Sequence, residues 1–236
     1  MNIDTAAQLN ERIKNKSTLE ILQFVSHEFG GKIKFASSMG LEDQVITHIL
    51  AAHKIPVEIF TLDTGRMFYE TYELIDKTQA RYKMQIKIYF PDAGEVEEMV
   101  NSKGINLFYQ SIENRKQCCG IRKIKPLKRA LKGIDAWITG LRKEQSPTRK
   151  DMQIIEWDES NSLIKVNPLL YWTEKQTRDF ITEHKIPYNT LHDKGFPSIG
   201  CQPCTRAVVQ GEDIRSGRWW WENPETKECG LHTKEK

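Results

Sequence analysis

Five cysteines are the residues of this 236-residue chain whose type and spacing most clearly suggest chemistry. Cys118 and Cys119 are adjacent, Cys201 and Cys204 form a Cys-x-x-Cys pair, and Cys229 stands alone near the C-terminus. Four thiolates are the usual ligand set for a zinc ion or an iron–sulfur cluster. Zinc sites space the ligands of a pair by two or more residues, whereas adjacent cysteines can bind different irons of a cluster. The spacing therefore favours a cluster over zinc, and independent buried thiols are the remaining alternative.

Cys229 lies outside that set of four and is a candidate nucleophile. His232 follows it closely, and Arg215 and Arg218 precede it. Cationic neighbours lower the pKa of a thiol and so increase the share of the nucleophilic thiolate. A C-terminal arm with little periodicity could carry such a thiol to a substrate and then to a second protein. The alternative is an incidental thiol, and the tryptophan run 219–221 favours packing that anchors the arm over a base-stacking platform.

The first of three polar loops follows an expected strand and begins an expected helix. It contains Ser37, Ser38 and Gly40. The free N–H groups and the dipole of a helix start favour an anion at such a place. The loop has no Gly-Lys-Ser/Thr ending and is therefore not a Walker A motif. A plain turn capped by serine is the alternative interpretation.

The second loop, at the end of the next expected strand, reads Asp63-Thr64-Gly65-Arg66. Asp63 could accept a hydrogen bond from a ribose hydroxyl, and Arg66 could contact a base or a phosphate. Asp-Thr-Gly alone is a common turn, so this loop indicates a binding site only in combination with the other two loops.

The third loop covers residues 140–149 and contains the cations Arg142, Lys143 and Arg149. Arginine forks match the oxygens of phosphate or sulfate, so the loop suits a multiply charged anion. A solvated basic loop is the alternative. Because neighbouring parallel strands end at one edge of a sheet, the three loops together favour an anionic nucleotide site.

The elements that must position these residues alternate between strands and helices. Periodicity and capping boxes predict helices over residues 17–29, 41–53, 67–82, 93–103, 121–132 and 173–184, and strands over 32–38, 57–63, 85–90, 136–141, 153–157 and 163–166. This alternation predicts an α/β fold with a doubly wound, mostly parallel sheet and ligands at the carboxyl ends of its strands. We expect residues 1–236 to form a single domain, of which about 205–236 is a C-terminal arm.

Composition limits the partners. Lys and Arg number 35 against 32 Asp and Glu, and this net charge of +3 excludes a strongly cationic nucleic-acid wrapper, though not a local basic patch. No apolar run approaches the roughly 18–20 residues that cross a bilayer, and no signal peptide is visible. We therefore expect a cytoplasmic protein without nucleic-acid or membrane partners, and whether it forms a homo-oligomer is left open.

Taken together, these motifs resemble those of the assimilatory sulfonucleotide reductases, specifically the iron–sulfur adenylyl-sulfate (adenosine 5′-phosphosulfate, APS) reductases. The resemblance runs from about residue 34 to 232, and Glu-Cys-Gly-Leu-His at 228–232 is among its most specific parts. It implies an adenine nucleotide α-hydrolase-like fold, Cys229 as nucleophile and thioredoxin as reductant. It also implies a [4Fe-4S] cluster on Cys118, Cys119, Cys201 and Cys204.

The same resemblance implies roles for the basic residues. Lys123, Arg215, Arg218 and His232 would lie at the phosphosulfate, while the three loops would line the nucleotide site. The implied reaction reduces APS to sulfite and AMP through an S-sulfocysteine on Cys229, which thioredoxin then releases.

Three other functions compete with this one. A reductase that prefers 3′-phosphoadenylyl sulfate (PAPS), or one that uses both nucleotides, is the nearest, and the cluster cysteines argue against it. An ATP pyrophosphatase or tRNA-thiolating relative would need a Ser-Gly-Gly-x-Asp-Ser loop that residues 37–43 lack. A non-enzymatic iron–sulfur redox sensor that binds nucleic acid is disfavoured by the near-neutral charge.

Overall fold

The computed structural model describes residues 1–146, 149–209, 211–213 and 215–222. The chain divides into two compact units. The first consists of Met1–Thr61, Glu73–Lys87 and Leu131–Asn189, and the second of Leu62–Tyr72, Ile88–Ala130 and the described residues after Asn189. The single domain with a C-terminal arm stays a prediction.

One six-stranded sheet has the strand order β3-β2-β1-β4-β6-β5. Its strands are β1 (Ile33–Ala36), β2 (Glu58–Leu62), β3 (Lys87–Tyr89), β4 (Ala136–Ile138), β5 (Ile155–Asp158) and β6 (Leu163–Val166). β1 pairs in parallel with β2 and β4, and β4 with β6, while β5 is antiparallel to β6. The predicted α/β fold with a mostly parallel sheet is confirmed, with β5 as the exception.

The centre of the sheet lies at β1. Phe35 pairs with Ile59 of β2 and with Ile138 of β4, and all three side chains are buried. The strand order runs outward from β1 through β2 to β3 and in the other direction from β4 to β6. The carboxyl ends of β1 and β4 therefore flank the point at which the order reverses, which is where open α/β sheets bind ligands.

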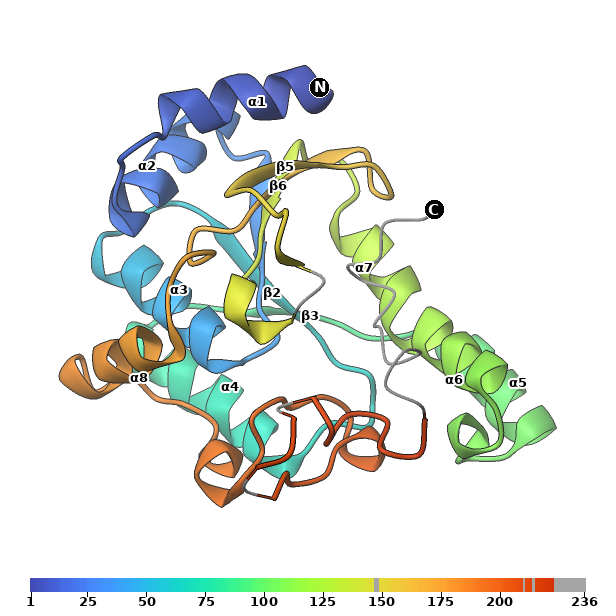
Figure 1. Ribbon diagram of the computed structural model, residues 1–236. Helices are drawn as coiled ribbons and strands as arrows, with labels where there is room; N and C mark the ends of the chain where they lie inside the picture. The colour runs from blue at the N-terminus through green and yellow to red at the C-terminus, as the bar shows by residue number, and fades with distance from the viewer. Residues whose placement is uncertain (147–148, 210, 214, 223–236) are drawn as a thin grey trace. The chain divides into compact units, whose positions relative to one another are not determined.

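Helices with a capping box in the sequence begin where that box predicts. The helices are α1 (Ile3–Arg12), α2 (Thr18–Phe29), α3 (Leu41–Ala52), α4 (Tyr69–Tyr82), α5 (Ala93–Lys103), α6 (Ile112–Cys119), α7 (Lys125–Ala130) and α8 (Glu174–Glu183). Ser17 forms a capping box with Glu20, and Thr173 forms one with Gln176, as the sequence predicts. Within the first unit, α3 lies alongside α8 (Figure 1).

Two regions differ from the sequence expectation. Neither α1 nor α6 was expected, because α1 buries only Ala6 and Leu9, and α6 buries only Arg115. The helix expected over 121–132 begins with a π-helical turn, Gly120–Ile124, before α7. Single π turns inside helices are frequent at functional sites.

The second unit has an apolar core around its cysteines. Met99, Leu107, Phe108, Cys204 and Trp219 are buried together, and the partly buried Val100, Cys118, Ile121, Cys201 and Trp221 pack against them. Trp219 thus packs into a core, in the manner expected of an anchoring residue, whereas its neighbour Trp220 is exposed.

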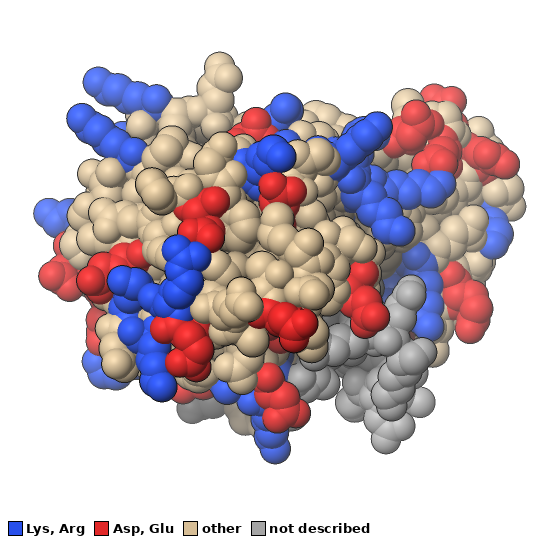
Figure 2. Space-filling model, turned by 90° about the horizontal axis from the view of Figure 1, so that it is seen from above, with Lys and Arg blue, Asp and Glu red and all other residues tan. Residues whose placement is uncertain are grey.

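The described surface carries charges of both signs. On the face shown in Figure 2, basic and acidic side chains lie interspersed over the described residues. Of the helices in the described ranges, none combines the length and the apolar character that crossing a membrane requires.

Candidate functional site

The loop after β1 is organised by the carboxylate of Asp43. Asp43 Oδ2 accepts hydrogen bonds from the Ser38 backbone N–H at 2.6 Å and from the Ser38 hydroxyl at 2.7 Å. Ser37 Oγ accepts from the N–H of Met39, which adopts the left-handed conformation at φ 63°. Gly40, the N-cap of α3, makes no side-chain capping bond. The sequence thus folds into a tight turn that leads into the start of α3, whose first turn carries Glu42 and Asp43.

Burial controls the protonation of Asp43. It raises the pKa of this carboxyl from 3.8 to about 6, an effect that the charge of Glu42 reinforces and the hydrogen bonds from Ser38 oppose. Asp43 therefore carries its negative charge only above mildly acidic pH.

The loop after β4 contacts the loop after β1. A Cβ atom at Gly140 would overlap the Asp43 carboxylate and lie 3.1 Å from Glu42 Cβ. Only a residue without a side chain allows this close approach. The structure therefore brings the first and third predicted loops together at the reversal point of the strand order.

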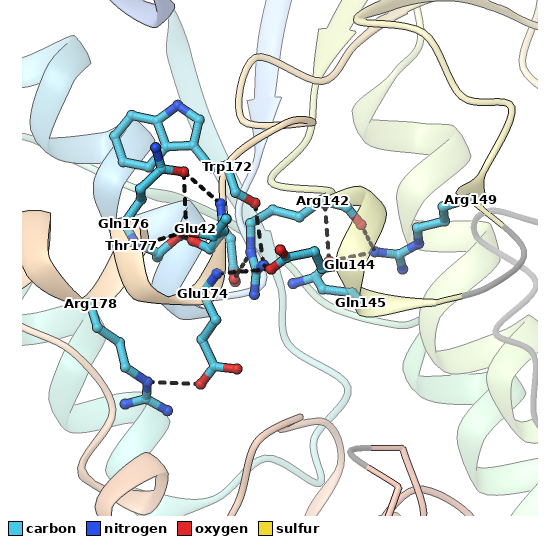
Figure 3. Close-up of polar contacts among 11 residues, drawn as sticks. Glu42, Arg142, Glu144, Gln145, Arg149, Trp172, Glu174, Gln176, Thr177 and Arg178 are labelled. Carbon is cyan, nitrogen blue, oxygen red and sulfur yellow. Dashed lines mark hydrogen bonds and ion pairs between the residues drawn. The ribbon is translucent and has the colours of Figure 1, made fainter.

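Arg142 lies between two carboxylates in this region (Figure 3). Its Nε donates to Glu42 Oε1 at 2.7 Å, and its Nη1 donates to Glu144 Oε2 at 3.1 Å. The Arg142 side chain is only 5% exposed. Its charge is thus offset inside the protein, and its fork holds the two loops in place.

The other two cations of this loop have separate contacts. Arg149 Nη1 donates to the Arg142 carbonyl at 3.4 Å and to Gln145 Oε1. The Lys143 ammonium lies 4.8 Å from the centre of the Tyr171 ring. Both side chains are half-buried, in contrast to the buried Arg142.

The second predicted loop belongs to the second unit. Asp63 and Thr64 are buried, and Asp63 Oδ1 accepts from the N–H of Gly65 at 2.7 Å and from the Tyr72 hydroxyl at 3.0 Å. Burial, followed by the bond to Asp63, raises the pKa of Tyr72 to about 12. Gly65 takes the left-handed conformation at φ 70° that this turn requires.

This loop also contacts the cysteine region. Thr64 Oγ1 lies 3.2 Å from Cys201 Sγ. The Arg66 guanidinium donates to the Ile105 carbonyl at 3.0 Å and to Asn106 Oδ1 at 2.9 Å, and it lies over the Phe108 ring. Arg66, which we expected at a base or phosphate, is thus held by a backbone carbonyl, an asparagine side chain and an aromatic ring.

The four cysteines of the predicted cluster set come together. Cys118 and Cys119 end α6, while Cys201 and Cys204 bound the 3₁₀ turn Gln202–Cys204. Burial raises the pKa of Cys204, and further increases come from Cys201, Cys119 and Cys118. All four are free thiols rather than disulfides. Cys118 and Cys201 also pack against the buried apolar core that contains Cys204.

Cations lie around these thiols. Arg122 counteracts the raised pKa of Cys118 through its charge and a hydrogen bond, and Arg66 acts in the same direction. Arg218 has the corresponding effect on the pKa of Cys204. Positive charge next to clustered thiols stabilises their deprotonated, metal-binding form.

The donor set fits an iron–sulfur cluster. Cys204 is buried in an apolar core, and Cys118 and Cys201 pack against that core. Four cysteine ligands are the set that such clusters use. Within the described ranges, no three or more histidine, cysteine, aspartate or glutamate side chains are placed to ligate one shared metal ion. A single ion needs all its ligand atoms on one coordination sphere, whereas the cysteines of a cluster bind separate irons.

Arg218 lies in the cysteine region as well. Its guanidinium is 4.7 Å from the Trp219 ring centre, and its Nε is buried without a hydrogen-bond partner in the described part of the chain. A Cβ atom at Gly200 would come within 2.8 Å of Arg218 Nη1. The backbone N–H of Arg218 donates a hydrogen bond to the Arg215 carbonyl at 2.9 Å, so both arginines lie in one turn.

The remaining predicted site residues are distributed as follows. Lys123 is half-buried in the π-helical turn directly after Arg122. Cys229 and His232 lie outside the described residues.

Four residues that shape these sites have no role in the sequence prediction. Arg122 follows Cys118 by four residues, a helical spacing that could have identified it. Glu42 and Asp43 are the last residues of the first loop motif, 37–43, but their contact with Gly140 has no local signal. Arg115 is paired with a residue 107 positions away, which no local pattern reveals.

The comparisons with known proteins agree with this geometry. Residues 32–207 match the model of the phosphoadenosine phosphosulfate reductase domain family. The chain belongs to this family. The family resemblance that the sequence predicts is therefore confirmed.

Relatives within this family are close over nearly the full length. The chain is 50% identical to the adenosine 5′-phosphosulfate reductase of Allochromatium vinosum over 94% of its own length and 86% of the relative's. It is 45% identical to the protein of the same name from Burkholderia cepacia, over 98% and 93% of the two chains.

Solved structures support the fold. A phosphoadenylyl-sulfate (PAPS) reductase from Candida auris, solved as a phosphate complex, matches with a TM-score of 0.76 and 32% identity, covering 88% of this chain and 98% of that one. Yeast FAD synthetase matches with a TM-score of 0.53 at 17% identity, covering 88% and 77%, and so shows a likeness of fold alone.

Proposed function

We propose that this chain reduces adenosine 5′-phosphosulfate to sulfite and AMP in sulfate assimilation. The observation that carries the proposal is the assembly of Cys118, Cys119, Cys201 and Cys204 beside basic residues. This assembly occurs in a chain that is 45–50% identical to relatives named adenosine 5′-phosphosulfate reductase.

The nucleotide is bound first, by backbone and basic groups. The turn of Ser37, Ser38 and Gly40 supports this role because it leads directly into the start of α3. Arg149 and the second loop, with Asp63, Thr64, Gly65 and Arg66, supply further polar contacts. Arg142 acts from a fixed position, since Glu42 and Glu144 hold its guanidinium.

Cys229 then attacks the substrate. Its thiolate sulfur forms a bond to the sulfonyl sulfur, the bond from that sulfur to the bridging oxygen breaks, and AMP leaves with the electron pair. An anionic nucleophile meets an anionic phosphosulfate here, so the main barrier is charge repulsion. Lys123, Arg215, Arg218 and His232 offset that repulsion.

Thioredoxin completes the reaction. One of its thiolates attacks Cys229 Sγ of the S-sulfocysteine, and sulfite leaves with the electron pair of the broken S–S bond. The second thioredoxin thiol resolves the mixed disulfide and restores the Cys229 thiolate. Thioredoxin is thereby oxidised to its disulfide, and its two electrons reduce the transferred sulfur. We expect this reaction to take place in the cytoplasm, where cysteine thiols stay reduced.

A [4Fe-4S] cluster would be held by Cys118, Cys119, Cys201 and Cys204, and it would join the two cysteine pairs and add negative charge between them. The arginines at positions 66, 122 and 218 support this assignment because they oppose the rise in thiol pKa. In this scheme no electron needs to pass through the cluster.

PAPS reduction is a second candidate, since the Candida auris relative of 32% identity is a PAPS reductase. An assay of both nucleotides decides between them. The chain is purified anaerobically, its iron and sulfide are counted, and thioredoxin-dependent sulfite release is measured from APS and from PAPS. We expect iron and sulfide in equal amounts and faster release from APS. Faster release from PAPS would assign the second function, and full activity in a zinc-only preparation would refute the cluster.

A further inference from the structure

A buried ion pair joins the helix of the adjacent cysteines to the segment that precedes Cys229. Arg115 Nε donates to Glu222 Oε1 at 2.9 Å, and Arg115 Nη2 donates to Glu222 Oε2 at 2.8 Å. The two side chains are 2% and 3% exposed. The Arg115 guanidinium also lies over the Trp219 ring, 4.7 Å from its centre. The pair is therefore held by two parallel bonds and an aromatic face.

Such a pair contributes more to geometry than to stability. Removing two charges from water costs nearly as much as their attraction returns, so apolar side chains of similar size would be about as stable. A bidentate fork, in contrast, fixes both the distance and the orientation of its carboxylate. Arg115 therefore holds Glu222 in one defined place.

Each residue of the pair is connected to one of the two cysteine pairs. Arg115 precedes Cys118 by three residues in α6, so the two side chains share a face of the helix. On the other side, Trp219 N–H donates to the Cys204 carbonyl at 3.2 Å, and Glu222 N–H donates to the Trp219 carbonyl at 2.9 Å. The segment from Trp219 to Glu222 thus runs from one cysteine pair to the helix that carries the other.

We propose that Arg115 and Glu222 are positioning residues for Cys229. Cys229 follows Glu222 by seven residues, and seven residues span at most about 25 Å. The pair sets the point from which this span begins, and it ties that point to α6. Cys229 then starts its approach from a defined place relative to the cysteine region. This inference rests on the proposed role of Cys229 as the nucleophile.

The test uses substitutions that separate position from charge. Arg115→Lys keeps the positive charge beside Glu222 but cannot form the fork. The double variant Arg115→Met, Glu222→Leu removes both charges and so leaves no buried charge unpaired, which guards against a failure to fold. Arg12→Lys is the matched control, because Arg12 forms the same fork with Glu28, at 2.7 and 2.8 Å, on side chains that are 53% and 30% exposed.

Four quantities are measured on the iron-loaded full chain. They are iron content, nucleotide affinity, the single-turnover rate of S-sulfocysteine formation by mass spectrometry, and thioredoxin-dependent sulfite release from the preformed intermediate. In both test variants we expect S-sulfocysteine formation to slow at least tenfold, because the segment before Cys229 loses its fixed anchor and the thiol reaches its reacting geometry less often. In the same two variants, iron content, nucleotide affinity and sulfite release from the preformed intermediate should stay within twofold of the parent. In the control Arg12→Lys, all four quantities should stay within twofold of the parent.

Other results would overturn the inference. Formation rates within twofold of the parent in both test variants would show that the pair does not position Cys229. A parallel loss of iron content and nucleotide affinity would show a purely structural role. If the parent chain itself forms no S-sulfocysteine, the proposed function fails rather than this inference alone.

Discussion

Arg142 Nε donates to Glu42 Oε1 at 2.7 Å, and this ion pair joins the loop after β4 to the first turn of α3. Glu42 lies in the helix that follows β1 and Arg142 in the loop that follows β4, and these two strands are parallel neighbours. Glu144, which is 54% exposed, provides the second carboxylate for the same guanidinium. An arginine that the sequence assigns to substrate thus has a further role as a brace between two loops.

The variant Glu42→Gln tests this brace. Loss of a charged hydrogen bond in a largely buried place should lower the free energy of unfolding by about 1.5–3 kcal/mol. The KM for the nucleotide should rise several-fold with a smaller change in kcat, because Glu42 orients Arg142 and touches no reacting atom. Glu144→Gln is the control, since loss of an exposed ion pair costs less than about 1 kcal/mol. Equal effects of the two substitutions on unfolding and KM would contradict the brace.

Gly140→Ala should disturb the contact between the same two loops. Its Cβ would overlap the Asp43 carboxylate and crowd Glu42 Cβ, and overpacking of this kind costs about 1–3 kcal/mol. Chemical denaturation should show the loss of stability, and AMP titration should show a weaker affinity for the nucleotide. Gly94→Ala in α5 serves as the control, because its Cβ would make an ordinary contact of 3.4 Å with Asp92. That control should be neutral or stabilise by up to about 1 kcal/mol, and a loss at Gly94 as large as at Gly140 would contradict the steric argument.

The pKa of Asp43 predicts how Asp43→Asn depends on pH. In the folded protein the pKa is about 6, above the ordinary value of 3.8, so between these values the folded state holds a proton that the unfolded state has released. The contribution of Asp43 to stability therefore falls as pH rises through this window. The variant should gain up to about 3 kcal/mol relative to the parent between pH 4 and pH 7. Denaturation at several pH values measures this, and a difference that does not change with pH would refute it.

Cys229→Ser should abolish sulfite formation while leaving nucleotide binding within about twofold, because only the nucleophile is lost. Thioredoxin-coupled sulfite release and AMP titration measure the two properties. Appreciable turnover by the serine variant would remove Cys229 from the proposed mechanism.

Local signals account for the parts of the fold that sequence reasoning predicted. The capping boxes at Ser17 and Thr173 depend on residues three positions apart, and the strands of the sheet core are apolar runs. The interrupted helix around Gly120 was not foreseeable, because its π-helical turn has no distinct residue pattern. Helix α6 was missed for a related reason. Its buried residue is charged, and the carboxylate that pairs with it belongs to Glu222, far along the chain.

The sequence by itself determined the chemistry that this protein can perform. The types and order of its four paired cysteines, its lone Cys229 and its basic loops are properties of the chain, and they predict the family that the comparisons confirm. Only the tertiary structure decided which charges act together. Arg142 meets Glu42, and Arg115 meets Glu222, across 100 and 107 positions of sequence. Pairing at such separation depends on how strands and helices pack, and no periodicity or spacing within one element specifies it.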